Sequence, residues 1–146
     1  MGRTGVSVRE VLGYVTTILV LLLILLVAVG KIRVAVVDGI SMEPTMHTGD
    51  LVFLEKKAPD KIKVNDIVVY RSGKRYIIHR VIDIYKVNGE YCYVIKGDNN
   101  PVPDPGFPEC RGRGVPYRAI LGVVYGIDGE PIKIPYIGGI SVVLKG

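Results

Sequence analysis

The sequence has few residues that bind metals or form cross-links, with only two cysteines and two histidines among 146 residues. Cys92 and Cys110 are too few for a disulfide-rich scaffold, and no Cys-x-x-Cys or paired-histidine pattern indicates zinc. The two cysteines can form one disulfide or remain as two free thiols, and the sequence does not distinguish these states. The sequence therefore indicates neither a metal nor an organic cofactor.

Charge is not concentrated in one place either. The formal net charge is +5 at pH 7, and the lysines and arginines are scattered instead of forming a stripe interleaved with aromatic residues. That pattern argues against a nucleic-acid footprint, so no nucleic-acid partner is predicted. The basic residues are expected to form a solvated surface, with weak attraction to anionic lipid as the other option.

The longest feature that is present is an apolar run from Val11 to Gly30 without a charged residue. At about 1.5 Å per residue, a helix of this length spans about 30 Å, the hydrocarbon core of a bilayer. A cleaved secretory signal has a shorter apolar region and a small-x-small cleavage site, which Val27-Ala28-Val29 does not provide. We predict an N-terminal segment (1–10), a transmembrane helix (11–30) and one polar domain (31–146).

The polar domain carries strand signals and lacks a long amphipathic helix. Segments rich in valine, isoleucine and tyrosine alternate with turns, and Asn88-Gly89 is a strong hairpin signal. The predicted strands are Arg33–Asp38, Asp50–Glu55, Asp66–Arg71, Arg75–Tyr85, Tyr91–Lys96 and Tyr117–Gly126. The fold class is therefore mostly β, with one N-terminal transmembrane helix followed by a compact antiparallel β-domain.

Two segments of this domain do not read as ordinary strands. Asp98–Pro116 contains five prolines and three glycines, so it is predicted to be a long loop, and such loops are usually functional or disordered. Ile132–Leu144 is apolar but too short and too interrupted to span a bilayer. It is expected to be a core strand, with a segment that dips into the lipid headgroups as the alternative.

Gly39-Ile40-Ser41-Met42-Glu43-Pro44-Thr45-Met46 places a serine between a predicted strand and a proline turn. Most serines are surface or turn residues, so Ser41 alone indicates little, although Pro44 stiffens the turn behind it. Ser41 lies eleven residues after Gly30, and extended chain keeps it within about 40 Å of the apolar run. A nucleophile at this position reaches only substrates that are presented at the membrane surface.

His79 lies within a predicted strand among apolar residues. Strand alternation predicts Ile78, Ile82 and Ile84 on one face and Ile77, His79 and Val81 on the other. A histidine there can be a satisfied core group or a desolvated general base, since imidazoles ionise near neutral pH. His47 lies in a predicted turn and is the weaker candidate for a base.

Asp98 and Asp104 lie at the start of the proline-rich loop. Aspartates after a strand are ordinary turn formers, but a carboxylate beside a loop can also orient a histidine. Asp104 has six residues of loop with which to reach His79, so it is predicted to be the orienting acid. Asp98 lies at the strand end, so it is predicted to pin the loop through backbone N–H groups.

These segments together resemble the sequence boxes of type I signal peptidases. The residues that carry the resemblance are Val37-Asp38-Gly39-Ile40-Ser41-Met42-Glu43-Pro44-Thr45, Gly49-Asp50-Leu51-Val52, Asn65-Asp66-Ile67-Val68-Val69-Tyr70, His79-Arg80-Val81 and Lys96-Gly97-Asp98-Asn99-Asn100. They occur in the family's order and cover most of residues 34–104. Bacterial members carry a lysine where His79 stands, and a histidine there resembles the archaeal and endoplasmic-reticulum branch.

The resemblance implies a β-domain of the signal peptidase type, with Ser41 as nucleophile and His79 as general base. It implies Asp104 as the acid that orients His79 and Asp98 as a second important carboxylate. One position departs from the pattern, because many members carry a serine two residues before the nucleophile, where this chain has Gly39. The hydroxyl of that serine helps to bind the oxyanion, so the Ser41 N–H and another donor must suffice here.

The resemblance further implies a membrane-bound serine endopeptidase that removes signal peptides from exported preproteins by cutting after a small residue. The substrate is expected to lie along a strand edge, with shallow apolar pockets lined by Ile40, Met42, Ile77 and Ile78. Expected partners are secretory preproteins, membrane lipid and the protein-export machinery. Because signal peptides are cut after translocation, residues 1–10 would be cytoplasmic and residues 31–146 extracytoplasmic, at the cell or endoplasmic-reticulum membrane.

Two other hypotheses are weighed against this one. Lys74 could replace His79 as the base of a Ser–Lys dyad, but it lies in a glycine-containing turn, a poor place to desolvate an amine. A membrane-tethered β-domain for adhesion or assembly needs no catalytic residue at all. It would leave the co-occurrence of Ser41, His79 and the two aspartates as an accident.

Overall fold

The computed structural model describes residues 6–30 and 32–135, and the chain divides into two compact units between Ile32 and Arg33. The first unit contains α1 (Val8–Ala28). The Ser7 hydroxyl accepts from the Glu10 N–H while the Glu10 carboxylate accepts from the Ser7 N–H, which forms a capping box. Because this box sets the start of the helix, α1 begins three residues before the predicted Val11.

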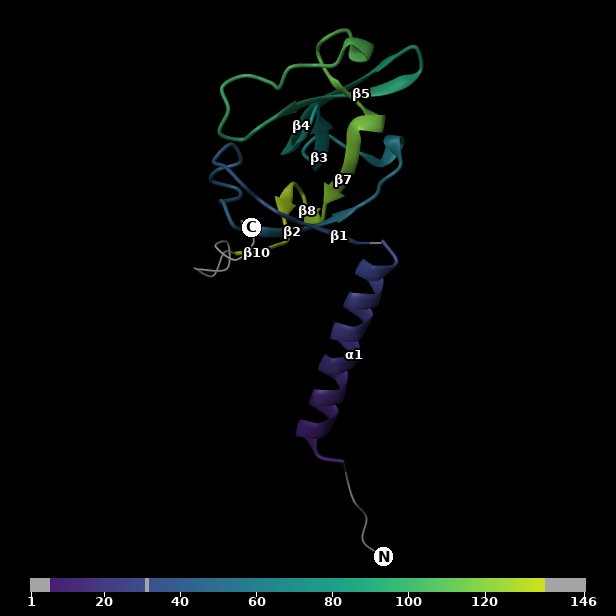
Figure 1. The fold of residues 1–146 in the computed structure, drawn as a ribbon, viewed down its shortest axis with the longest axis vertical. Coiled ribbons are helices and arrows are strands. Elements are labelled where there is room, and N and C mark those ends of the chain that lie inside the picture. Colours follow the sequence, from purple (N-terminus) through teal and green to yellow (C-terminus); the bar gives the residue numbers. More distant parts are fainter. Residues whose placement is uncertain (1–5, 31, 136–146) are drawn as a thin grey trace, which may run out of the picture. The chain divides into compact units, whose positions relative to one another are not determined.

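The helix is long and apolar enough to cross a membrane by its length and composition. In the second unit, residues 33–135 form strands and three single turns of 3-10 helix, which Figure 1 labels in part. Its elements are β1 (Arg33–Val36), β2 (Leu51–Glu55), η1 (Pro59–Lys61), β3 (Ile67–Ser72), β4 (Arg75–Val87), β5 (Glu90–Lys96), η2 (Pro108–Cys110), β6 (Val115–Pro116), η3 (Tyr117–Ala119), β7 (Ile120–Val124), β8 (Gly126–Ile127), β9 (Glu130–Pro131) and β10 (Lys133–Ile134).

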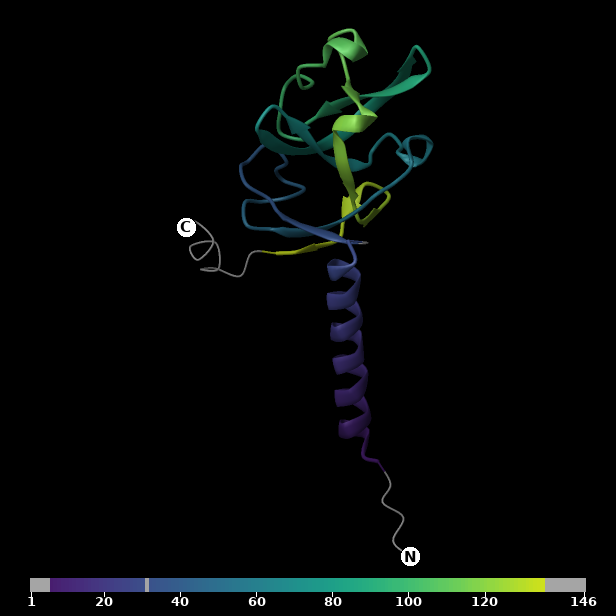
Figure 2. The same cartoon turned by 45° about the vertical axis from the view of Figure 1, so that its right-hand side comes forward.

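The strands form an antiparallel sheet in the order β1-β2-β7-β3-β4-β5-β6, and β10 also pairs with β2. The hairpin of β8 and β9 forms a separate small sheet. Strand β7, late in the sequence, inserts between β2 and β3. Figure 2 shows the same elements from a second side. The predicted fold class, mostly antiparallel β after one apolar helix, is therefore confirmed.

The core lies on both faces of the central strand β3. Ile67 and Val69 belong to a first core cluster, shared with residues that follow β1, and Val68 and Tyr70 belong to a second, shared with β4 and β5. Because both faces of β3 are buried, its sequence is a continuous apolar run instead of an alternating one. All six predicted strands are present within a few residues of their predicted ends.

One predicted strand starts in the wrong place. Tyr117–Ala119 is the 3-10 turn η3, so β7 begins only at Ile120. The reason lies in the sheet order: β6 pairs with β5, whereas β7 pairs with β3 and β2. The chain must leave one position in the sheet and turn before it enters the other.

The predicted faces of β4 are also corrected. Ile78 packs on the first core cluster, and Ile77 and Val81 pack on the second, as alternation requires. Ile84, predicted on the side of Ile78, packs instead on the second cluster. The cause is a shift in the pairing of β4 with β5 between Val81 and Asp83, which exchanges the two faces beyond that point.

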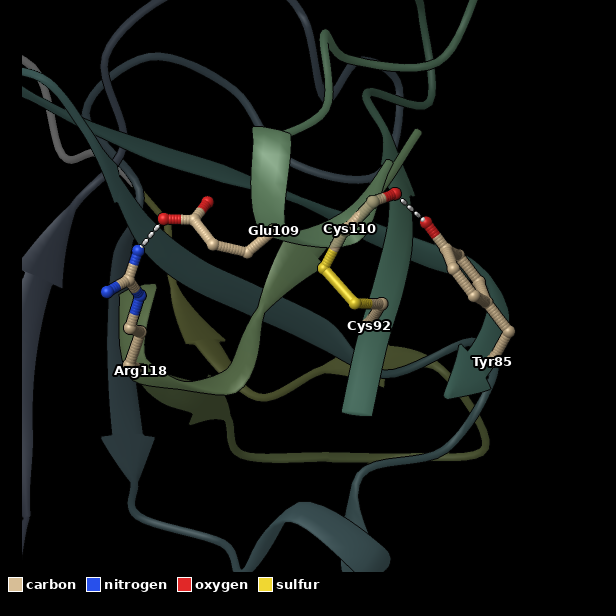
Figure 3. The surroundings of a disulfide bond; sticks show 5 residues. All are labelled: Tyr85, Cys92, Glu109, Cys110 and Arg118. Atoms are coloured by element: carbon tan, nitrogen blue, oxygen red, sulfur yellow. Dashed lines mark hydrogen bonds and ion pairs between the residues drawn. A yellow bond between two sulfur atoms is a disulfide. The ribbon is translucent and has the colours of Figure 1, made fainter. Parts of the chain in front are cut away.

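The proline-rich segment is largely irregular, as predicted, and it is tied to β5 by a disulfide between Cys92 and Cys110. Both cysteines are fully buried, and the Tyr85 hydroxyl donates to the Cys110 carbonyl, as drawn in Figure 3. An ion pair between Glu109 and Arg118 lies nearby. The structure thus selects the disulfide from the two cysteine states that the sequence left open.

The predicted core strand at Ile132–Leu144 is only partly described. Lys133–Ile134 forms β10, but Ile132 and Ile134 are about half exposed, at 53% and 49%. The described part is therefore a short strand with outward-facing isoleucines and not a core strand, because Lys133 takes the inward position beside Asp50. Residues 136–144 of this prediction lie outside the described residues.

Candidate active site

Ser41 lies in the connection between β1 and β2, residues 37–50, which we call the nucleophile loop. Three apolar side chains of this loop, those of Val37, Met42 and Met46, are buried in the first core cluster. Burial of each such side chain contributes about 1.5–3 kcal/mol relative to leaving it exposed. The loop is therefore anchored to the core by its own residues, while Ser41 itself is only partly buried.

His79 lies in β4 and is 6% exposed. The pairing of β4 with β3 places it opposite Val68, which is fully buried in the second core cluster. The imidazole Nε2 lies 2.9 Å from the Ser41 Oγ. The structure thus brings together two predicted site residues that are 38 positions apart in sequence.

Asp104 lies in the connection between β5 and β6, residues 97–114, which we call the acid loop. Its backbone N–H donates to the Ile95 carbonyl at 2.8 Å, and its Oδ2 lies 2.5 Å from the His79 Nδ1. A carboxylate only accepts hydrogen bonds, so Nδ1 is the nitrogen that carries the proton. The Nε2 lone pair then faces the hydroxyl of Ser41, the direction that a general base requires.

Tyr70 is a site residue to which the sequence reasoning assigned no role. It is fully buried in β3, and its hydroxyl donates to the Asp104 Oδ2 at 2.8 Å. That oxygen therefore accepts from Tyr70 and from His79 together. A usable signal exists in the sequence, because a tight turn at Gly73-Lys74 would pair Tyr70 with Ile77 and place it on the face of His79.

Asp98 is held by side chains. Arg80 donates from Nε to Oδ1 at 2.8 Å and from Nη2 to Oδ2 at 2.7 Å, and the Thr45 hydroxyl donates to Oδ2 at 2.6 Å. The predicted pinning through backbone N–H groups is therefore corrected to an ion pair with a hydroxyl bond. Burial favours the neutral acid, but the Arg80 and Thr45 bonds outweigh it, so the pKa of Asp98 is lowered.

Asp98 thereby joins the acid loop to the nucleophile loop, and a second set of bonds joins them near Ser41. The Asn99 N–H donates to the Ser41 carbonyl at 2.9 Å, and its side-chain amide donates to the Ile40 carbonyl at 3.1 Å. A Cβ on Gly97 would lie 2.6 Å from that Ser41 carbonyl oxygen and 2.9 Å from His79 Nε2. Only glycine therefore fits at this point of close approach.

The nucleophile loop is also held from the side of β10. The Lys133 ammonium donates to the Thr45 carbonyl at 2.8 Å and lies 2.9 Å from a carboxylate oxygen of Asp50, which is 3% exposed. Asp50 also accepts from the His47 N–H at 3.0 Å. Sequence reasoning could not find these contacts, because Lys133 is 88 positions from Thr45.

The four residues predicted to line substrate pockets differ in their surroundings. Ile40, next to Ser41, is 64% exposed. Met42 is fully buried in the first core cluster, so in this structure its side chain presents no surface to a substrate. Ile77 and Ile78 are partly buried and pack on opposite core clusters.

The two other candidate bases lie elsewhere. Lys74 is exposed in the turn between β3 and β4, and the side chain of His47 is exposed in the nucleophile loop. Within residues 6–30 and 32–135, no group of three or more histidine, cysteine, aspartate or glutamate side chains is arranged to hold a metal ion. The side chain at 2.9 Å from the Ser41 Oγ is that of His79.

Comparison with known proteins identifies the family of this chain. Residues 9–85 match the family model described as signal peptidase, peptidase S26, so the chain belongs to that family. It is 35% identical over 115 residues to the signal peptidase complex catalytic subunit SEC11C of Homo sapiens and of Mus musculus, which covers 77% of this chain and 56% of each relative. It is 37% identical over 83 residues to an uncharacterised protein of Methanocaldococcus jannaschii, which covers 57% of this chain and 37% of that protein.

The chain thus spans little more than half the length of the SEC11C relatives that it matches. The match confirms the resemblance seen in the sequence, including its similarity to the archaeal and endoplasmic-reticulum branch.

Proposed function

We propose that this chain is a membrane-bound serine endopeptidase that removes N-terminal signal peptides from exported preproteins. The observation that carries the proposal is the series of contacts from Ser41 through His79 to Asp104 in a member of the signal peptidase family. A hydroxyl beside an imidazole that is bonded to a carboxylate is suited to acyl transfer. The SEC11C relatives contribute only the family assignment to this argument, and the uncharacterised M. jannaschii protein contributes nothing to it.

In the proposed reaction the Ser41 Oγ attacks the carbonyl carbon of the small residue that precedes the cut, while His79 Nε2 takes the hydroxyl proton. The imidazolium, stabilised by Asp104, then donates that proton to the leaving amine as the peptide bond breaks. An acyl-enzyme on Ser41 remains. Water deprotonated by His79 hydrolyses this ester and restores the free serine.

The negative oxygen formed during attack needs donors, and Gly39 supplies no side chain for this purpose. The Ser41 N–H donates to no other group in the described part of the chain, so we assign it to the oxyanion. Gly39 has φ of +102°, and its N–H donates to the Thr48 hydroxyl at 3.0 Å. This left-handed conformation, which glycine adopts readily, shapes the backbone directly ahead of the nucleophile.

Substrate contact is assigned first to Ile40, because it is exposed and adjacent to Ser41. The substrate would lie extended, with backbone bonds to a strand edge and small side chains selected by shallow apolar pockets. Ile77 and Ile78 are partly exposed, and only that exposed surface is proposed to contact the substrate. Measuring cleavage of preproteins with alanine or leucine before the cut would test the selection, and equal rates on both would contradict it.

We further assign the β-domain to the extracytoplasmic side, with α1 in the lipid and the N-terminal residues in the cytoplasm. The buried disulfide supports this side, because disulfides persist in oxidising compartments. Protease added outside intact cells or spheroplasts should degrade the β-domain. Protection of the domain until the cells are lysed would contradict the assignment.

The proposed partners are secretory preproteins, membrane lipid and the protein-export machinery. The relatives are named as subunits of a signal peptidase complex, which supports a search for companion chains. Purification of the tagged chain from its native membranes in mild detergent tests this. Recovery of the chain alone, in fully active form, would contradict a need for companions.

The decisive experiment is cleavage of a preprotein by the purified full chain in detergent or nanodiscs. Ser41→Ala and His79→Ala should each lower the rate by about 10⁴-fold or more, and the double variant should be little worse because the pair acts as a unit. His47→Ala and Lys74→Ala are the matched controls and should keep most activity. An active His79→Ala beside an inactive Lys74→Ala would overturn the assignment of the base.

A further inference from the structure

Tyr70 is a buried tyrosine. Among the described residues its hydroxyl forms a hydrogen bond with Asp104 and with no other group. It donates to the same Asp104 oxygen that holds the His79 Nδ1, at 2.8 and 2.5 Å respectively. In the β3–β4 pairing Tyr70 lies opposite Ile77 and His79 lies opposite Val68, so Tyr70 and His79 are diagonal neighbours on one face. The sheet itself therefore sets the position of Tyr70 relative to His79, and the acid loop brings Asp104 to both.

The Tyr70 hydroxyl stays protonated, and so remains a donor, throughout the pH range in which histidines ordinarily titrate. Burial, together with the bond to the Asp104 carboxylate, raises the pKa of Tyr70 far above its ordinary value. A protonated phenol that donates to a carboxylate stabilises the anion and shares its negative charge. Less of that charge is then available to favour a positive imidazole on the other side of the same oxygen.

We infer that Tyr70 is a positioning residue that fixes the Asp104 carboxylate and tunes the pH at which His79 becomes the neutral base. The catalytic meaning of this inference rests on the proposed function, but the contact itself does not. Without the Tyr70 hydroxyl, the Asp104 oxygen would no longer share its negative charge with a second donor and would interact more strongly with His79. The protonated imidazole would then persist to higher pH.

The other ionisable groups near the pair make contacts that do not involve Tyr70. The Arg80–Asp98 ion pair lies on β4 and the acid loop, and its charges cancel locally. On β5, the Lys96 ammonium donates to the carbonyls of Gly97 and Asn100. From the nucleophile loop the Ser41 hydroxyl faces Nε2.

Tyr70→Phe removes the hydroxyl and keeps the buried ring, and Tyr93→Phe is its matched control. Tyr93 is also fully buried in the second core cluster, but its hydroxyl donates to the Pro59 carbonyl at 2.8 Å, away from His79. Both variants lose one buried hydroxyl bond, so both should lose similar thermal stability. Only Tyr70→Phe should change the behaviour of His79.

The first measurement does not need enzyme activity. The chain contains two histidines, so ¹⁵N-histidine labelling of the full chain in nanodiscs gives ring-nitrogen signals from two imidazoles, and the His79→Ala spectrum assigns them. In Tyr70→Phe the pH midpoint of the His79 signal should rise by about 0.5–1 unit. The exposed His47 signal, and both signals in Tyr93→Phe, should stay where they are in the wild type.

The second measurement is preprotein cleavage between about pH 5 and 9, where a change at a histidine is visible. In Tyr70→Phe the acid limb of the pH–rate profile should move to higher pH, together with the midpoint of the His79 signal. Tyr93→Phe should keep the wild-type profile. A midpoint that is unchanged or lower in Tyr70→Phe would overturn the inference, as would an equal shift in Tyr93→Phe. Absence of cleavage by the wild type would instead count against the proposed function and leave the imidazole measurement to decide on Tyr70.

Discussion

The nucleophile loop and the acid loop meet at Ser41 and His79, but they are held in place in different ways. The nucleophile loop places Val37, Met42 and Met46 in the core, so hydrophobic burial anchors it. In the acid loop Cys110 is the one fully buried apolar side chain among the described residues, with Phe107 partly buried on the second cluster. The loop therefore depends more on a disulfide and on hydrogen bonds. Single substitutions in the acid loop should therefore each remove one kind of contact and differ in their effects on activity and stability.

Loss of the Asp104 charge should have the largest effect. Asp104→Asn keeps the shape of the side chain but no longer stabilises an imidazolium, so cleavage should fall by about 10³–10⁴-fold. Thermal melting should change much less, because an amide oxygen can still accept from Tyr70. Rates and melting curves on the purified chain check this, and a variant with near-normal rates would show that another group orients His79.

Loss of the Asp98 charge should lower both activity and stability, because Asp98 ties Arg80 to Thr45 across the two loops. Asp98→Asn should cost about 1–3 kcal/mol of the free energy of unfolding near neutral pH. The activity loss should be smaller than for Asp104→Asn, since Asp98 does not touch His79 in the described contacts. The matched control is Asp83→Asn, whose partner Arg113 is exposed, and it should change stability by less than about 0.5 kcal/mol.

The same pair predicts a pH dependence of stability. The pKa of Asp98 is lower in the folded chain than its ordinary value, so the stabilisation is complete above about pH 4, the ordinary aspartate value. It is lost as the pH falls through the lowered folded value. Melting curves below pH 4 should therefore converge for wild type and Asp98→Asn, and curves that stay parallel would contradict a role of this charge in stability.

Removal of the disulfide should affect stability more than chemistry. The linked cysteines are 18 positions apart, and closing a loop of this size contributes about 3 kcal/mol in the chain-entropy model. The paired Cys92→Ala and Cys110→Ala changes should lower the melting temperature and make the acid loop easier to cleave with protease. Preprotein cleavage should fall only a few-fold, because the contacts of Asp104 with His79 and Tyr70 remain. An unchanged melting temperature in the cysteine-free chain would show that the disulfide does not stabilise this loop.

Local patterns in the sequence predicted much of this molecule. The apolar run, the six strands and the irregular acid loop all follow from patterns confined to a few neighbouring residues. The change of face in β4 did not, because it arises from its pairing with β5 between Val81 and Asp83. The role of Tyr70 was missed because a tyrosine in a buried strand is ordinarily a core residue, and only the hairpin register places it beside His79.

The candidate site divides in the same way. Ser41, His79 and the two aspartates were singled out from the sequence, and the pinning of Asp98 was predicted with the wrong partners. Arg80 is adjacent to His79 in sequence, yet its carboxylate partner lies 18 positions away and the Thr45 hydroxyl lies 53 positions from Asp98. Such partners are set by the order of the strands, which no local pattern contains.

From sequence alone, the family, the fold class and the residue types at the site can be read, because hydrophobic period and motif spacing are local properties. The tertiary structure decided that the cysteines pair, that Met42 is buried, and that Asp104 and Tyr70 share one oxygen beside His79. These outcomes depend on β7 entering the sheet between β2 and β3 and on the register of each pair. Contacts between distant residues depend on the order and register of the assembled strands, so the geometry of the site is a property of the fold and not of any one segment.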